Sequence, residues 1–481
     1  MSVAEALIVE KPKSVLDEEE EEEEFDEPTG YLRYVILILA TLCCSVVVSC
    51  NFVFNFAVVC GDKSHANETS TSLDFPNEWL RMLYSAFPLG NLVMLPFVSI
   101  ITHKCSQRVM ITVGGLITAI STLLVPYAYE IHPVYVIVLR FIQGVGMTPM
   151  IPLNAHVSAR WTPAHKIGFF LAVMTGNSQV SNCSEAYGSI VLQIGIFFTM
   201  GISGFLCGQG FSWQVLYYTH GLVALAVYIT WVIVFRDFPT THPWITKKEV
   251  KLILGENHES KTAPHKIKEP TPYKAIFTNI SVWSVLIAGF GNFNGVTPVI
   301  VFSSTIIRQA LGFSQYMTGF YNSSSFFMQF ILKIVGGHLS DILRFSETNK
   351  LRFFNSISCG LSGVLMLMSA FISSSHYNVC LFFIVMIQGV IGFNSAGFNK
   401  AAIVVARQHA HVILTVQGFG MCLGMVLEPF LVYHVAPDQT WEQWKFLFIG
   451  HGLVLIVTNA IYCIGIRGRA APFTKTRALP S

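Results

Sequence analysis

Twelve long stretches of this sequence contain few or no charged side chains, and they constrain the fold more than any other feature. A helix needs roughly 20 apolar residues to cross the hydrocarbon core of a bilayer. Only 12% of all residues are charged, compared with about 25% in soluble proteins. The sequence therefore predicts an all-α polytopic protein embedded in a lipid bilayer. The predicted spans are residues 33–59, 79–101, 109–129, 134–156, 166–206, 215–235, 281–307, 316–340, 351–372, 376–398, 411–435 and 445–466.

Lysine and arginine are distributed unevenly between the two sets of loops. If the amino terminus is cytosolic, the cytosolic segments next to the spans hold 21 of these residues and the opposite side holds four. Cytosolic loops carry the excess of lysine and arginine in membrane proteins, so both termini are predicted to be cytosolic. The sequon Asn67-Glu68-Thr69 then lies on the opposite side, and Asn67 is a predicted glycosylation site.

A polar segment divides the chain into two halves of six spans each. Residues 236–280 hold eight lysines and arginines and no predicted span, which indicates a cytosolic linker. Residues 33–235 and 281–466 are predicted to form two six-helix bundles that enclose one central site. The acidic residues 1–32 are predicted to be a disordered cytosolic tail, and residues 467–481 a second cytosolic tail.

The fifth apolar stretch, residues 166–206, is too long for one helix and too short for two helices and a loop. Its middle is polar, with Asn182, Ser184 and Glu185. Removing residues 180–193 leaves one continuous apolar helix, so this block is predicted to be an insertion such as a retained intron. If the block is present in the functional protein, the fifth helix is disrupted and transport is in doubt.

Several short motifs occur in an order that is typical of one transporter family. They are Arg140-Phe141-Ile142-Gln143-Gly144, Ile202-Ser203-Gly204-Phe205-Leu206-Cys207, Asp237-Phe238-Pro239 and Gly337-His338-Leu339-Ser340-Asp341. Together they resemble the anion:cation symporters of the major facilitator superfamily (solute carrier family 17), which include phosphate, sialic acid and vesicular glutamate transporters. The resemblance covers roughly residues 30 to 465. It implies a major facilitator fold with 12 transmembrane helices in two six-helix bundles.

The resemblance also implies which residues form the central site. In glutamate-type and sialic-acid-type members, charged or ionisable residues of helices 1, 2, 4 and 7 are associated with anion binding and proton coupling. The matching positions here hold Asn51, Tyr84, Met147 and Asn292, and only the arginine of helix 4 is kept, as Arg140. The predicted substrate-binding residues are Arg140, Asn51, Tyr84, Asn292 and Asn294. Glycines around Asn292 and Asn294 indicate that the seventh span can bend or unwind around a substrate.

Ionisable residues inside a span cost at least about 2.5 kcal/mol and tend to mark substrate or proton pathways. Arg140 can hold a carboxylate or phosphate through two parallel hydrogen bonds, or it can snorkel to the outer interface. For Lys333 we expect snorkelling to lipid headgroups rather than coupling. Glu428 can carry a proton or pair with a neighbour, and His156 can carry a proton or serve in packing. The candidates for coupling are Glu428, Lys333 and His156.

The remaining motifs exclude several classes of protein. No metal-ligand pair or nucleophile elbow is present, so the sequence predicts neither an enzyme nor a metal site, and no cofactor. A net charge of +2 gives no indication of nucleic-acid binding. Most of the eleven cysteines lie inside apolar spans and are expected to be small buried hydrophobic residues; examples are Cys43, Cys44, Cys359, Cys380 and Cys463.

The leading interpretation is a secondary active transporter of a small organic or inorganic anion. It works by alternating access, with a proton or sodium ion as the possible coupling ion, in the plasma membrane or a lysosomal or vesicular membrane. The alternative is a facilitator fold that has lost coupling and acts as a uniporter, a receptor-like protein or a scaffold. The charges that are absent from helices 1, 2 and 7 favour the alternative.

Overall fold

The computed structural model describes residues 30–60, 75–150, 189–254 and 271–474, together with residues 153, 156, 157, 160 and 161. In this part of the chain every regular element is a helix and no strand occurs. Seven helical stretches are long and apolar enough to cross a membrane, and one of them, Ser374–Val435, contains two of the predicted spans. Each of the twelve predicted spans overlaps at least one helix. The predicted all-α membrane architecture is therefore confirmed.

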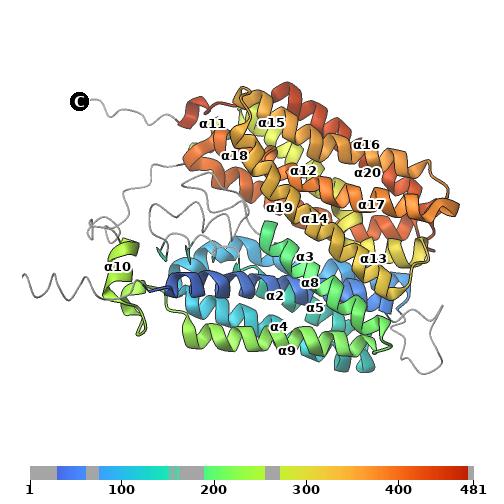
Figure 1. The fold of residues 1–481 in the computed structure, drawn as a ribbon, viewed down its shortest axis with the longest axis horizontal. Coiled ribbons are helices and arrows are strands. Elements are labelled where there is room, and N and C mark those ends of the chain that lie inside the picture. Colours follow the sequence, from blue (N-terminus) through green and yellow to red (C-terminus); the bar gives the residue numbers. More distant parts are fainter. Residues whose placement is uncertain are drawn as a thin grey trace, which may run out of the picture.

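The helices form two groups, which Figure 1 shows in blue to green and in yellow to red. The first group consists of α2 (Leu32–Cys60), α3 (Asn77–Lys104), α4 (Gln107–Ile131), α5 (Pro133–Met147), α8 (Ser189–Gly208) and α9 (Trp213–Val234). The second consists of α12 (Ile280–Val301), α13 (Ser303–Thr305), η4 (Ile306–Ala310), α14 (Gln315–Ile342), α15 (Glu347–Asn355), η5 (Ser356–Leu361), α16 (Ser362–Ala370), α17 (Tyr377–Val390), η7 (Ile391–Ser395), α18 (Phe398–Ala406), α19 (Ala410–Val435) and α20 (Trp441–Gly465). The groups meet where α8 packs on α14 and α3 packs on α19.

Capping residues and glycines explain where helices begin and how closely they pack. Ser106 and Ser314 precede α4 and α14, and each side chain accepts a hydrogen bond from a backbone N–H of the first turn. Such caps satisfy N–H groups that have no partner within the helix. Gly90 on α3 and Gly144 on α5 lie where a side chain would meet the backbone of the facing helix. Glycine at both positions therefore allows α3 and α5 to pack closely.

A short helix of the linker, α10 (Lys247–Leu254), is tied to the start of α2. The fully buried Glu249 carboxylate accepts hydrogen bonds from Arg33 N and Arg33 Nη1, both at 3.0 Å, and from Leu32 N at 3.3 Å. A carboxylate at this place also interacts favourably with the positive end of the helix dipole. The first part of the linker thus packs on the first helix group.

The helix bundle has two ends, which we call the disulfide end and the linker end. The disulfide end holds Cys60 at the end of α2 and the loop that follows α8, and the linker end holds Leu32 at the start of α2 and α10. Helices α3 and α14 run from the disulfide end to the linker end, whereas α2, α8 and α19 run the other way. In Figure 1 the linker end is on the left, next to α10.

The structure bears on the predicted bending of the seventh span and on the predicted insertion in the fifth span. Within the seventh span, α12 is a continuous helix to Val301, and its Gly291 and Gly295 pack against Thr458 and Leu455 of α20. The span then bends at Phe302 and continues as α13 and the π-helical turn η4. The bend lies beyond the glycines, which serve close helix packing. Of the predicted insertion, residues 180–188 lie outside the described residues, and residues 189–193 begin α8. The glycosylation candidate Asn67 also lies outside the described residues.

Candidate functional site

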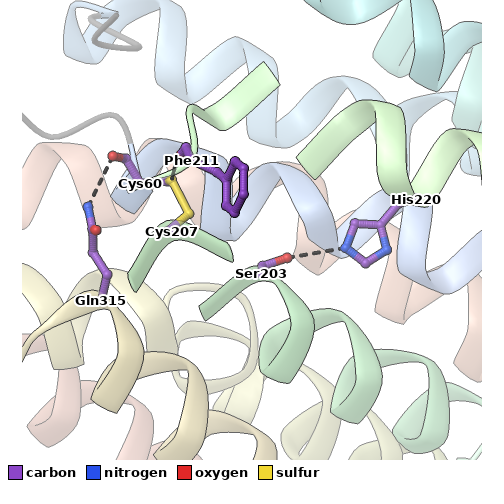
Figure 2. Close-up of a disulfide and its surroundings, with 6 residues drawn as sticks. All are labelled: Cys60, Ser203, Cys207, Phe211, His220 and Gln315. Atoms are coloured by element: carbon purple, nitrogen blue, oxygen red, sulfur yellow. Dashed lines mark hydrogen bonds between the residues drawn. A yellow bond between two sulfur atoms is a disulfide. The ribbon is translucent and has the colours of Figure 1, made fainter. Parts of the chain in front are cut away.

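A disulfide bond joins the first and fifth spans. Cys60 at the end of α2 is bonded to Cys207 at the end of α8, 147 residues further along the chain, as Figure 2 shows. Gln315 of α14 donates a hydrogen bond from Nε2 to Cys60 O at 3.1 Å, so the second helix group contacts this corner directly. The sequence did not indicate this pair, although Cys43, Cys44, Cys359 and Cys380 are buried free cysteines as predicted.

We expect loss of this disulfide to lower the stability of the protein by about 2–4 kcal/mol, because the bond restricts the unfolded chain. The variants Cys60→Ser and Cys207→Ser should melt at the same lowered temperature in detergent. Their melting should no longer respond to a reducing agent, whereas the wild type should lose stability when reduced. Replacement of the exposed free Cys105 is the control and should change nothing. A reductant-sensitive Cys60→Ser variant would contradict the prediction.

His220 of α9 is enclosed by hydroxyl groups close to this corner. Its Nε2 lies 3.2 Å from Ser203 Oγ of α8 (Figure 2), and its Nδ1 lies 2.8 Å from Ser49 Oγ of α2. Thr199 of α8 donates a hydrogen bond to Ser49 Oγ at 2.7 Å. The histidine thus joins α2, α8 and α9 by hydrogen bonds, as expected for a packing residue.

Hydrogen bonds between the two helix groups close the disulfide end. Three donors on α3 bind carbonyl oxygens of α19 or of the loop after it: Asn77 Nδ2 to Pro437 O at 2.9 Å, Arg81 Nη2 to Tyr433 O at 3.3 Å and Ser85 Oγ to Val426 O at 2.7 Å. On the other side of the bundle, Ser323 Oγ of α14 donates to Phe197 O of α8 at 2.6 Å. These contacts lie in the half of the bundle nearer to the disulfide end.

A layer of aromatic side chains continues this closure towards the centre. Tyr84 of α3 packs on Phe54 of α2 with ring centroids 4.8 Å apart, and on Phe302 of the second group at 4.7 Å. Phe302 also contacts Tyr433 at 5.9 Å and Trp444 at 6.0 Å. Tyr84 is only 4% exposed. The structure therefore places this predicted substrate-binding residue in the closure between the two groups.

Arg140 of α5 lies directly against this aromatic layer. Its guanidinium stacks on Phe54 at 4.5 Å, and it donates hydrogen bonds from Nη1 to Asn51 O at 3.0 Å and from Nε to Leu83 O at 3.4 Å. The side chain is 2% exposed, so it does not snorkel. Among the described residues, Nη2 has no hydrogen-bond partner and no carboxylate pairs with the guanidinium. Arg140 is thus a buried positive charge with free N–H groups.

Amide side chains of α2 lie beside this charge. Asn51, whose carbonyl oxygen binds Arg140, and Asn55 are one helical turn apart, and both are at least nine-tenths buried. Neither side chain forms a hydrogen bond with the described residues. The sequence analysis named Asn51 but missed Asn55, although their spacing of four residues puts both on one face of a helix. It also missed Gln143, whose Oε1 accepts from Arg140 Nη1 at 3.4 Å.

The structure does not bring Asn292 and Asn294 of α12 into contact with Arg140 in the described part of the chain. The Asn292 side chain is used within the second group: Nδ2 lies 3.4 Å from Ser358 Oγ, and Oδ1 accepts from Asn394 Nδ2 at 3.3 Å. Ser358 and Asn394 belong to the π-helical turn η5 and the 3-10 turn η7. Asn294 donates to Phe290 O of its own helix at 2.8 Å. The Asn292 amide therefore joins the side chains of these two turns.

The coupling candidates also lie apart from Arg140. Lys333 of α14 is 2% exposed and packs beside η7, where its carbonyl accepts from Ser395 Oγ at 3.4 Å, so the expected snorkelling was wrong. His156 Nε2 lies 3.3 Å from Asp237 O at the linker end. Glu428 of α19 has a partner that the sequence did not indicate: its Oε1 lies 3.1 Å from Nε2 of His451 on α20.

The sequence of this chain is similar to sequences of known proteins over most of its length. The family model described as Major Facilitator Superfamily matches residues 37–429. The vesicular glutamate transporter 1 of Xenopus laevis is 25% identical over 463 residues, which are 92% of this chain and 76% of the relative. The human vesicular glutamate transporter 2 is 25% identical over 461 residues, which are 92% and 75% of the two chains. The resemblance inferred from the short motifs is therefore confirmed.

Solved structures show the same fold. A crystal structure of a D-xylose-proton symporter superimposes with a TM-score of 0.62 at 12% identity, and covers 90% of this chain and 98% of the symporter. A bacterial homologue of the human lysosomal transporter Spinster, in an inward-facing and unoccupied conformation, superimposes with a TM-score of 0.63 at 12% identity. It covers 91% of this chain and 98% of the homologue.

Proposed function

The chain belongs to the Major Facilitator Superfamily, and from this premise we propose that it is a secondary active transporter of a small anion. Its family and its relatives make it a membrane transporter rather than an enzyme. The proposal adds three points: the charge of the solute, the residues that bind it, and the alternating access of one site to the two sides of the membrane.

The observation that carries this proposal is the buried, unpaired guanidinium of Arg140. A buried charge is costly unless an opposite charge compensates it, and the described residues provide carbonyl oxygens and aromatic faces but no carboxylate. A solute carboxylate or phosphate supplies the missing charge and accepts hydrogen bonds from Nη2. The free amides of Asn51 and Asn55 then bind further polar groups of the same solute.

The number of charges at the site suggests the charge of the solute. Arg140 is the positive charge of the proposed site. Asn51 and Tyr84 add no positive charge, although family members carry charged or ionisable residues at the matching positions. We therefore favour a solute with one net negative charge. L-glutamate, named in the titles of the relatives, has one net negative charge at neutral pH and is the first candidate. Monocarboxylates and phosphate follow.

The disulfide supports the orientation that the loop charges predict. Disulfide bonds form and persist in the lumen of the secretory pathway or outside the cell, and are rare in the cytosol. The disulfide end is therefore proposed to face the exterior or an organelle lumen, with the linker end and both termini in the cytosol. The contacts of α3 with α19 then close the non-cytosolic side. In this orientation the structure is closed towards the exterior or lumen.

Uptake into liposomes tests this function. Purified protein in liposomes should accumulate radiolabelled L-glutamate, a monocarboxylate or phosphate above protein-free liposomes, when a pH or sodium gradient is imposed. Accumulation against the solute gradient supports secondary active transport. Equilibration without accumulation would show a uniporter. Stabilisation of the protein by a solute without any flux would show a receptor-like protein and would contradict the proposal.

A further inference from the structure

Glu428 is unusual among the carboxylates of this sequence. It is the only aspartate or glutamate within the twelve predicted spans apart from Glu185, which belongs to the predicted insertion outside the described residues. Glu428 lies seven residues before the end of α19 at Val435, and His451 lies ten residues after the start of α20 at Trp441. At 1.5 Å per residue these positions are about 10 and 15 Å inside their helices.

The geometry makes Glu428 and His451 one isolated pair. Their side chains are 6% and 8% exposed, and Glu428 Oε1 lies 3.1 Å from His451 Nε2. Neither atom has another hydrogen-bond partner in the described part of the chain. A carboxylate in this position is costly without a proton or a cation beside it. The pair is therefore suited to hold a proton that both residues share.

The groups around the pair leave it as the main titratable site of this region. The packing helices α12 and α16 contain no titratable residue. Titratable groups on elements that pack against α19 or α20 include Arg81 and Tyr84 of α3, Cys359 of η5 and Arg308 of η4, and α19 itself carries Cys422 and Tyr433. The guanidinium of Arg81 donates to Tyr433 O, and that of Arg308 donates to Phe313 O at 2.8 Å. Both cations are thus engaged by backbone carbonyls.

Glu428 also lies between two contacts that close the disulfide end. Val426 O accepts from Ser85, and Tyr433 O accepts from Arg81, so this segment of α19 is held against α3 on both sides of Glu428. When the disulfide end is closed, the pair is buried. When these contacts open, water from that side reaches this segment. The free energy of closure then depends on the charge of the pair.

We propose that Glu428 and His451 form the proton-binding site that couples proton movement to closure of the disulfide end. One proton taken from water converts the carboxylate and the neutral imidazole, with a net charge of −1, into a pair with no net charge. The neutral pair stabilises the closed state, because it removes an uncompensated charge from the membrane interior. The same proton leaves when the pair regains access to water on the other side. The coupling role rests on the proposed transport function, whereas proton binding itself does not.

Proton binding can be tested without a substrate. Infrared difference spectra of the purified protein in lipid nanodiscs between pH 5 and pH 8 should contain bands from protonation of this pair. Those bands should be lost in Glu428→Gln and altered in His451→Gln. They should persist in Glu442→Gln, a control on α20 whose carboxylate is exposed and pairs with Lys445 at 2.8 Å. Identical difference spectra for wild type and Glu428→Gln would overturn the proposal.

Coupling is tested in liposomes with radiolabelled L-glutamate and the other anions of the uptake assay. For Glu428→Gln, accumulation should become independent of an imposed pH gradient, whereas Glu442→Gln should respond like the wild type. A Glu428→Gln variant that still follows the pH gradient would overturn the coupling role. If the wild type transports none of the anions, the proposed function fails, and the infrared titration still decides whether the pair binds a proton.

Discussion

Replacing Arg140 with alanine is expected to reduce anion uptake to the level of protein-free liposomes. The substitution removes the positive charge and the free Nη2 group, and with them two hydrogen bonds to the solute. Hydrogen bonds to charged groups contribute about 1.5–3 kcal/mol each. Since 1.4 kcal/mol corresponds to a tenfold change in affinity, the loss of two such bonds weakens binding by roughly a hundredfold or more. Initial rates of uptake over a range of solute concentrations measure this effect.

Two further variants separate binding from folding, because Arg140 also holds Asn51 O of α2 and Leu83 O of α3. Arg140→Lys keeps the charge but has no planar guanidinium to bind both carbonyls and a solute at once. We expect this variant to fold and to retain weak uptake. Replacement of Arg467, an exposed arginine at the linker end, should leave uptake unchanged. Normal uptake by a correctly folded Arg140→Ala protein would refute the role of Arg140.

Introducing leucine at Gly204 should prevent closure of the disulfide end. Gly204 of α8 faces Gly319 of α14, and a Cβ atom at position 204 would lie 2.6 Å from Gly319 Cα. This contact is between backbone atoms of the two helix groups. A larger side chain therefore fits only if the two groups move apart. Overpacking costs typically about 1–3 kcal/mol, which shifts the equilibrium towards the open state by roughly fivefold to more than a hundredfold. Uptake should fall correspondingly, because each transport cycle requires closure.

The open state can be detected by labelling. A cysteine introduced at Asn55 should react slowly with a membrane-impermeant maleimide applied from the disulfide end, because the closed groups cover it. The same cysteine should react rapidly in the Gly204→Leu background. Gly418→Leu on α19 is a suitable control, because nothing lies within 4 Å of a Cβ atom at that position. Equal labelling in the two backgrounds would show that the contact between Gly204 and Gly319 does not govern closure.

The site could be predicted from sequence only in part. Arg140 was identified because a charge within an apolar span is costly wherever the chain folds. Asn51, which the family resemblance named, lies beside it and accepts its hydrogen bond through the backbone carbonyl. Asn292 lies apart from Arg140 in this structure, and its amide binds Ser358 and Asn394 from two irregular turns. A hydropathy pattern shows neither these irregular turns nor the hydrogen-bond partners of an amide side chain.

Sequence alone therefore determined the class of the protein and predicted twelve spans, each of which overlaps a helix in the described part of the chain. The physical reason is that the free energy of placing a helix in lipid depends on about twenty consecutive residues, all of which are adjacent in the chain. Only the tertiary structure decided which polar groups meet across helices. Cys60 and Cys207 are 147 residues apart, and Glu428 and His451 lie on different helices. Such pairs form because the helices pack together, and packing depends on the whole chain at once.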